Sequence, residues 1–216
     1  MTTLLEVESY MIDMYLTNCK NENNNNKNKY IINSLSLNLP FQLDKIVLKK
    51  SNIHGFGCFA KTKIMKGELI TFFPADIIEF KPDGDKIINN KKTYIISSQR
   101  FEKTNGKIKH NEFNRKKYRD LNYSYQIDEF YKIYSTSYFN FDTNYLGHFI
   151  NDGAKSNSCE KSDKIYSNIS QLKSNCKYYN FENNLHIAII STRDIDIGEE
   201  LLITYGSKYW YKFNNI

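Results

Sequence analysis

The amino-acid sequence predicts a mixed, β-rich fold with one main domain. Aromatic residues make up 15% of the 216 residues, with 17 Tyr and 14 Phe but only three Pro, which suits sheets better than a helical bundle. The apolar residues also fall into short runs bounded by Gly, Asn and charged residues, a pattern typical of strands. A chain of this length can form one domain with a sizeable core and an N-terminal appendage.

The appendage is predicted at residues 1–29. Its first part, 4–18, has apolar residues at helical spacing, and we expect this helix to dock on the core rather than to bind a partner. Residues 21–29 are Asn-rich and of low complexity, with nothing to bury, which indicates a flexible linker. The main domain is therefore predicted at 30–216.

The main domain opens with a strand at 45–49, a polar turn and the motif Gly55-Phe56-Gly57 before a strand at 58–60. Taken alone, a Gly-x-Gly motif is also explained by a glycine-rich turn or bulge. Strands are predicted next at 69–73 and 75–80, with Pro74 at a kink between them.

The pattern weakens between 81 and 137, where strands are predicted at 93–96 and 130–134. Residues 86–119 contain 11 Lys and Arg against two acidic residues, a net charge of +9 in a chain whose total is +6. The rest of the chain therefore carries −3. This basic segment is either a solvated loop or a surface that contacts nucleic-acid phosphates.

Residues 142–150 predict a short helix with Asp142 as its N-cap, ending at Asn151-Asp152-Gly153. The polar stretch 155–174 is predicted to be an inserted surface loop. A hairpin follows, with strands at 177–181 and 185–192.

The last apolar run, 201–204, predicts a buried strand that delivers Tyr205 to a tight turn at Gly206. Tyr205 is the leading candidate for chemistry, although a core tyrosine would also explain it. Tyr209, Trp210 and Phe213 can then cover the site as a short aromatic helix.

Composition excludes several classes of protein. The four Cys residues stand far apart without a Cys-x-x-Cys pair, which argues against a structural metal site and against a secreted disulfide scaffold. No apolar run approaches the length that spans a membrane. We therefore expect an intracellular, soluble protein with reduced thiols and no metal.

In this order, the blocks 53–60, 146–152 and 198–206 resemble the SET domain family of protein lysine methyltransferases, over about residues 44–212. The chain looks most like small viral-type members without flanking zinc modules. The resemblance implies a β-clip fold of short sheets with a C-terminal pseudoknot and few short helices. It also identifies 81–137 as the family's variable insert and 155–174 as an extra loop.

The same resemblance implies S-adenosylmethionine as cofactor and assigns site residues. Tyr205 matches the family's catalytic tyrosine, and Tyr138 is a second candidate in the channel wall. The family motif has Asn-His where this chain has Asn151 followed by Asp152, which is a departure. The residues implied in cofactor binding are His54, Gly55, Phe56, Gly57, Asn151, Asp152, Tyr205 and Trp210.

The implied substrate is a lysine of a histone tail or another basic protein, in the nucleus or a host nucleus, with the 86–119 segment on nucleosomal DNA. Two other functions remain open from the sequence. One is a SET-like binding module without activity, and the other is a β-clip structural protein without a cofactor.

Overall fold

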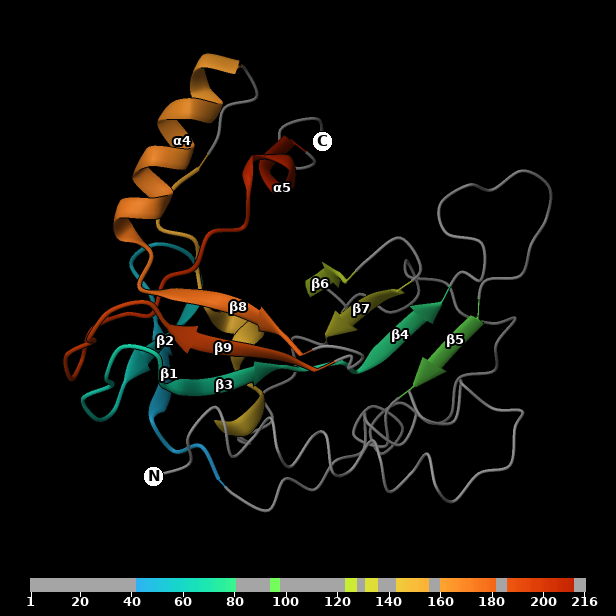
Figure 1. Ribbon diagram of the computed structural model, residues 1–216, viewed down its shortest axis with the longest axis horizontal. Helices are drawn as coiled ribbons and strands as arrows, with labels where there is room; N and C mark the ends of the chain where they lie inside the picture. The colour runs from blue at the N-terminus through green and yellow to red at the C-terminus, as the bar shows by residue number, and fades with distance from the viewer. Residues whose placement is uncertain are drawn as a thin grey trace.

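Three small antiparallel sheets and short helices make up the computed structural model, which describes residues 42–80, 94–97, 123–127, 131–135, 143–155, 160–181 and 186–211 (Figure 1). The predicted β-rich architecture of short sheets is confirmed. The predictions for 4–18 and 21–29 lie outside the described residues, as does most of 81–137. In the part described, no helix is both long and apolar enough to cross a membrane.

The first sheet is a hairpin of β1 (Ile46–Lys50) and β2 (Phe56–Ala60), close to the strands predicted here. The Ser51 N–H donates to the Gly55 carbonyl at 2.9 Å and closes the turn between them. Gly55 has a φ of +50°, a conformation that glycine adopts without the steric clash of a Cβ. The turn therefore requires glycine at this position for its backbone shape.

The second sheet contains the predicted C-terminal hairpin, joined to an earlier strand. Its order is β3 (Leu69–Phe73), β9 (Ile187–Ser191) and β8 (Cys176–Asn180). Central Ala188 lies opposite Phe72 on one side and Tyr179 on the other. All five residues of β9 are buried, which explains its nearly continuous apolar sequence.

The third sheet has the order β5 (Tyr94–Ser97), β4 (Ile77–Phe80), β7 (Tyr131–Ser135) and β6 (Tyr123–Gln126). Three of these strands were predicted within one or two residues. Strand β6 was not, because its sequence Tyr-Ser-Tyr-Gln has no apolar run to mark it. Ile78 of β4 and Ile133 of β7 lie opposite each other and are fully buried, so this sheet has its own apolar core.

The C-terminal stretch 199–205 is extended, but the prediction of a strand at 201–204 was wrong. It makes isolated contacts with three segments far apart in sequence: the Leu201 N–H donates to Cys58 O, and the Ile203 N–H to Asn151 O. The Leu202 carbonyl accepts from the backbone of Asn175. Because no single neighbour runs alongside it, no ladder forms. The stretch instead contacts each of these segments in turn. The pseudoknot implied by the resemblance, in which the segment after Asn151 is tucked under another loop, stays a prediction.

Two 3-10 turns, Thr143–Tyr145 and Gly147–Phe149, stand in place of the single helix predicted over 142–150, and the predicted N-cap Asp142 lies outside the described residues. Tertiary contacts hold this tighter path. The Leu146 N–H donates to the Thr71 hydroxyl at 2.9 Å, and a Cβ at Gly147 would lie 2.9 Å from the Phe72 carbonyl oxygen. The segment therefore lies directly against β3.

The stretch 155–174 was predicted to be a loop, and this prediction was wrong because residues Glu160–Lys173 form helix α4. It stands beside the short helix α5 (Ser207–Tyr211), on the same side of the three-stranded sheet (Figure 1). Tyr166 and Ser170 of α4 are buried while its neighbouring residues are exposed. One anchored face therefore stabilises a helix whose composition is mostly polar.

Candidate functional site

Three segments that are distant in sequence meet at the side chain of Asn151. Its Nδ2 donates to the carbonyl oxygens of His54 at 3.2 Å and Phe56 at 3.1 Å, and lies 3.0 Å from Glu200 Oε1. Asn151 is 6% exposed, so these contacts are shielded from water. The asparagine thus joins the glycine turn 54–57 to the extended stretch 199–205.

Gly57 packs closely against two side chains within the protein. A Cβ on residue 57 would overlap the Glu200 carboxylate and lie 3.0 Å from Asn151 Nδ2. Gly55 differs, because a Cβ there would meet nothing within 4 Å. Within the described residues, the Gly55 side of the turn is therefore open, and Phe56 beside it is 47% exposed.

A cavity lined mainly by aromatic side chains is next to the 150–151 segment. Ile150 lines it, and Asn151, the next residue, holds the glycine turn, so the two features are one residue apart along the chain. The cavity is lined by Phe73, Tyr123, Ser124, Tyr125, His148, Ile150, Tyr178, Tyr205 and Tyr209. Aromatic walls of this kind suit an aliphatic chain that ends in a cation.

The tyrosines of the cavity are neutral phenols at physiological pH. Burial raises the pKa of Tyr205 well above its usual value, and Tyr178 and Tyr209 raise it further. Burial also raises the pKa of Tyr178, with a smaller contribution from Tyr125. These groups can donate and accept hydrogen bonds but cannot serve as bases near pH 7.

Tyr205 is held from both ends by the segment 150–152. Its hydroxyl donates to the Ile150 carbonyl at 2.7 Å, and its backbone N–H donates to Asp152 Oδ2 at 2.9 Å. The ring also packs against Tyr209, with centroids 4.6 Å apart, and stacks on Trp210 at 6.1 Å. The phenol therefore has a defined position in the cavity wall.

The side chain of Asp152 points away from the glycine turn. It is 3% exposed and accepts hydrogen bonds from α4, from the stretch around Tyr205 and from Trp210 of α5. The residue in the position of the expected histidine is therefore part of an internal hydrogen-bond network. Any contact with a ligand at the turn would come from its backbone.

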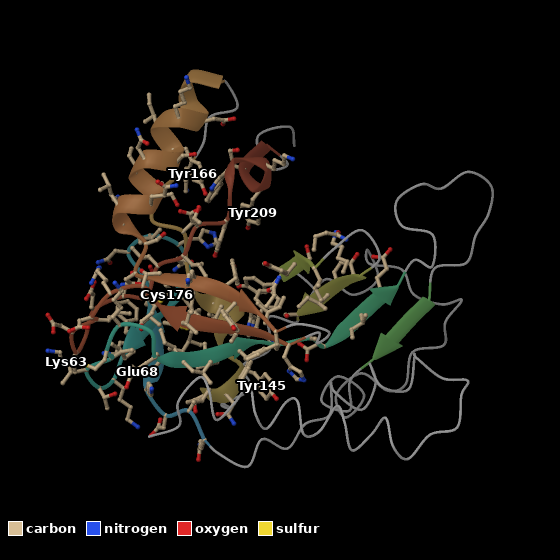
Figure 2. All side chains as sticks on the ribbon, viewed as in Figure 1. Lys63, Glu68, Tyr145, Tyr166, Cys176 and Tyr209 are labelled. Atoms are coloured by element: carbon tan, nitrogen blue, oxygen red, sulfur yellow. The ribbon has the colours of Figure 1, made fainter. Side chains whose placement is uncertain are left out.

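The structure brings most of the predicted site residues together, with one exception. The backbone of His54, Gly55, Phe56 and Gly57 forms one turn around Asn151, and Trp210 stacks on Tyr205 from α5. Tyr138 lies outside the described residues. Figure 2 shows Tyr209, a cavity residue, on the same short helix, near Tyr166 of α4.

Sequence reasoning missed several residues of the cavity. Tyr123 and Tyr125 come from β6, Tyr178 from β8, and His148 from the second 3-10 turn. The alternation Tyr123-Ser124-Tyr125 is the signal that could have found β6, since it places both rings on one face of a strand. No local signal marks Tyr178 or His148, because only the tertiary fold places them in the cavity.

Comparison with known sequence families gives a match over most of the chain. The sequence model of the SET domain matches residues 55–206. No curated protein matches the chain. A Plasmodium falciparum protein described as a candidate histone methyltransferase is a distant structural likeness, with 15% identity and a TM-score of 0.33 over 77% of this chain and 96% of that one. ATXR5 in complex with mono-methylated histone H3.1 is another, with 16% identity and a TM-score of 0.37 over 74% of this chain and 56% of that one.

Proposed function

The chain belongs to the SET domain family, and we propose on this basis that it is a protein lysine N-methyltransferase that uses S-adenosylmethionine. The matched residues, 55–206, include the glycine turn, the 150–152 segment and Tyr205. The main observation behind the proposal is the aromatic cavity. Tyr205 lines it and is fixed by hydrogen bonds to Ile150 and Asp152. A lysine side chain has the shape and charge that such a cavity accepts.

The reaction needs a neutral amine, because a protonated one has no lone pair. A lysine amine has an unperturbed pKa of about 10.4 and is almost fully charged at pH 7. Transfer into a cavity with apolar and aromatic walls disfavours the charged form and lowers that pKa. The cavity tyrosines stay protonated at this pH, so the amine's proton leaves to water.

Tyr205 can orient the amine that results. The proton of its hydroxyl is used in the bond to the Ile150 carbonyl, so the phenol oxygen faces the cavity as an acceptor. Accepting one N–H of the amine would fix the direction of the nitrogen lone pair. Alignment of this kind supplies a large share of the rate enhancement in a displacement reaction.

The glycine turn fits the cofactor that the family implies. When bound, S-adenosylmethionine supplies a methyl group on a sulfonium, which is the electrophile of the transfer. Gly55 leaves its side of the turn open and Phe56 presents an exposed ring there, which suits a ligand of mixed apolar and polar character. His54, Gly55 and Phe56 would hold it, with Asn151 shaping the turn, the Asp152 backbone adjacent and Trp210 covering Tyr205.

The proposed substrate is a lysine of a histone tail or another basic protein, in the nucleus or in a host nucleus. The support is the uneven charge of the chain, which is +9 over 86–119 and −3 over the remainder, within a total of +6. The net negative charge outside 86–119 favours binding of a basic peptide, and the basic segment favours contact with DNA phosphates beside that peptide.

Incubation of the purified full chain with labelled S-adenosylmethionine, histones and cell-extract proteins tests the function. We expect label on lysine of at least one basic protein, and far less with the Tyr205→Phe variant. Calorimetry with the cofactor distinguishes the alternatives. Cofactor binding without transfer would indicate a binding module, and absence of both would indicate a structural protein.

A further inference from the structure

The carboxylate of Asp152 collects five hydrogen bonds from three parts of the chain. All five donors are neutral groups, and the side chain is 3% exposed. The donors are the Ala154 N–H (3.0 Å), Tyr166 OH (2.5 Å), Ser170 OH (2.9 Å), Tyr205 N–H (2.9 Å) and Trp210 Nε1–H (3.4 Å). A buried carboxylate is stable only with a full set of donors such as this one.

One group of donors belongs to helix α4. Tyr166 and Ser170 lie four residues apart, so they share one face of the helix. Lys173, three residues further on, donates from Nζ to the Gly153 carbonyl at 3.0 Å. The same face of α4 therefore holds Asp152 and the residue after it. Figure 2 shows Tyr166 on this helix beside α5.

The other group belongs to the C-terminal stretch. Asp152 Oδ2 accepts from the backbone of Tyr205 and from the indole of Trp210, and the two rings stack on each other. The same oxygen accepts from Tyr166, whose hydroxyl is also 3.1 Å from Thr204 Oγ1. A single carboxylate oxygen thus joins α4, the Tyr205 backbone and α5.

We propose that Asp152 is a positioning residue, which fixes Tyr205 and Trp210 against helix α4 so that the Tyr205 hydroxyl stays in the cavity wall. It acts through Tyr205 and does not touch the reacting atoms. Helix α4 then helps to hold Tyr205 and Trp210 in position through Asp152. The expected effect on turnover rests on the proposed function, whereas the expected effect on Trp210 does not.

Two substitutions at residue 152 separate shape from hydrogen bonding. Asp152→Ala removes every bond that the carboxylate accepts. Asp152→Asn retains one oxygen, which can face Tyr205 and Trp210. Its NH₂ can donate to the Ser170 hydroxyl, but the bond from the Ala154 N–H is lost because both groups are donors. Asn should therefore preserve the C-terminal contacts that Ala loses. Tyr166→Phe tests the α4 side without changing residue 152.

Trp210 is the chain's single tryptophan, so its fluorescence reports on this network in the full chain without any cofactor. We expect Asp152→Ala to raise acrylamide quenching and shift the emission to longer wavelength, Tyr166→Phe to do so less, and Asp152→Asn to remain close to wild type. Ile190→Val serves as a control, since it loosens a core cluster that contains no residue of the cavity or of the network. The proposal would be overturned if Trp210 were as well shielded in Asp152→Ala as in Ile190→Val.

Steady-state kinetics well below the unfolding temperature gives the second measurement. We expect Asp152→Ala to lower kcat by roughly 10²-fold, as small displacements of an aligned group do, with Asp152→Asn closer to wild type. Ile190→Val should leave kcat unchanged. A loss in Asp152→Ala no greater than in that control would contradict the positioning role. Absence of transfer by the wild type, with the Trp210 response as expected, would refute the proposed function and leave the network established.

Discussion

The hydroxyl of Tyr205 donates a hydrogen bond to the carbonyl oxygen of Ile150 at 2.7 Å. This bond orients the phenol from the segment that also carries Asn151, whose side chain holds the glycine turn. Because the hydroxyl proton is used in this bond, the phenol oxygen presents an acceptor to the cavity. The orientation of the substrate amine therefore depends on a bond that lies wholly within the protein.

Tyr205→Phe should lower turnover by roughly 10²–10³-fold while retaining the ring and its packing. Thermodynamic stability should fall by no more than about 0.5–1.5 kcal/mol, the value of one hydrogen bond. Turnover on the labelled substrate and chemical denaturation measure the two effects. Tyr134→Phe is the matched control, because it removes a hydroxyl that donates to Glu79 and is not among the residues that line the cavity. Full activity of Tyr205→Phe would exclude the role assigned to this hydroxyl.

Gly57→Ala should destabilise the protein by about 1–3 kcal/mol, because its Cβ would overlap the Glu200 carboxylate. The penalty should shrink in a Glu200→Ala background, which a double-mutant cycle measured by denaturant unfolding would show. Gly67→Ala is the comparison: its φ of +83° disfavours alanine, but a Cβ there meets nothing within 4 Å. Its penalty should be the same with or without Glu200. Additive effects for Gly57 and Glu200 would contradict the overlap.

Alkaline pH should unfold the protein and ionise the cavity tyrosines in one transition. Burial raises the pKa of Tyr178 and Tyr205 above the ordinary value of 10.0, so the native state holds these protons longer than the unfolded chain does. Their contribution to stability is therefore complete below about pH 10 and is lost as the pH rises through the native pKa. Tyrosinate absorbance and circular dichroism should change together for these residues. If Tyr178 ionises in this transition, Tyr178→Phe should show a smaller rise in tyrosinate absorbance there. An unchanged rise would show that Tyr178 ionises at a different pH, outside the unfolding transition.

Reversing the charge of Lys116, Lys117 and Arg119 should weaken binding to nucleosomes and leave activity on isolated histone peptides unchanged. Contacts with phosphates release counterions, so the wild-type protein should also lose more nucleosome affinity with added salt than the variant does. Binding assays at two salt concentrations measure both effects. The control reverses three exposed lysines outside the basic segment: Lys50, Lys63 and Lys66. An equal loss with peptides would show that this surface belongs to the peptide site.

Much of the β structure could be predicted from the sequence, because local patterns decide it. Strands β3 and β9 are short apolar runs that only a buried sheet accommodates, and the β1–β2 hairpin is marked by its glycine turn. Gly57, Asn151 and Tyr205 could be selected as residue types in the order of a known family. The strands depend on local composition and spacing, whereas the selection of these three residues depends on the resemblance to the family.

Helix α4, the path of residues 199–205 and the role of Asp152 were decided by the tertiary structure. Ile165, Ile169 and Leu172 are exposed, so the helical spacing in 160–173 does not report a buried apolar face, and the anchor is the polar pair Tyr166 and Ser170. A carboxylate beside Asn151 carries no local sign of what it will accept. Its five donors lie between two and 58 residues away in sequence, and only folding brings them together. The sequence by itself determined which strands and motifs exist, and long-range hydrogen bonding determined how the site is held.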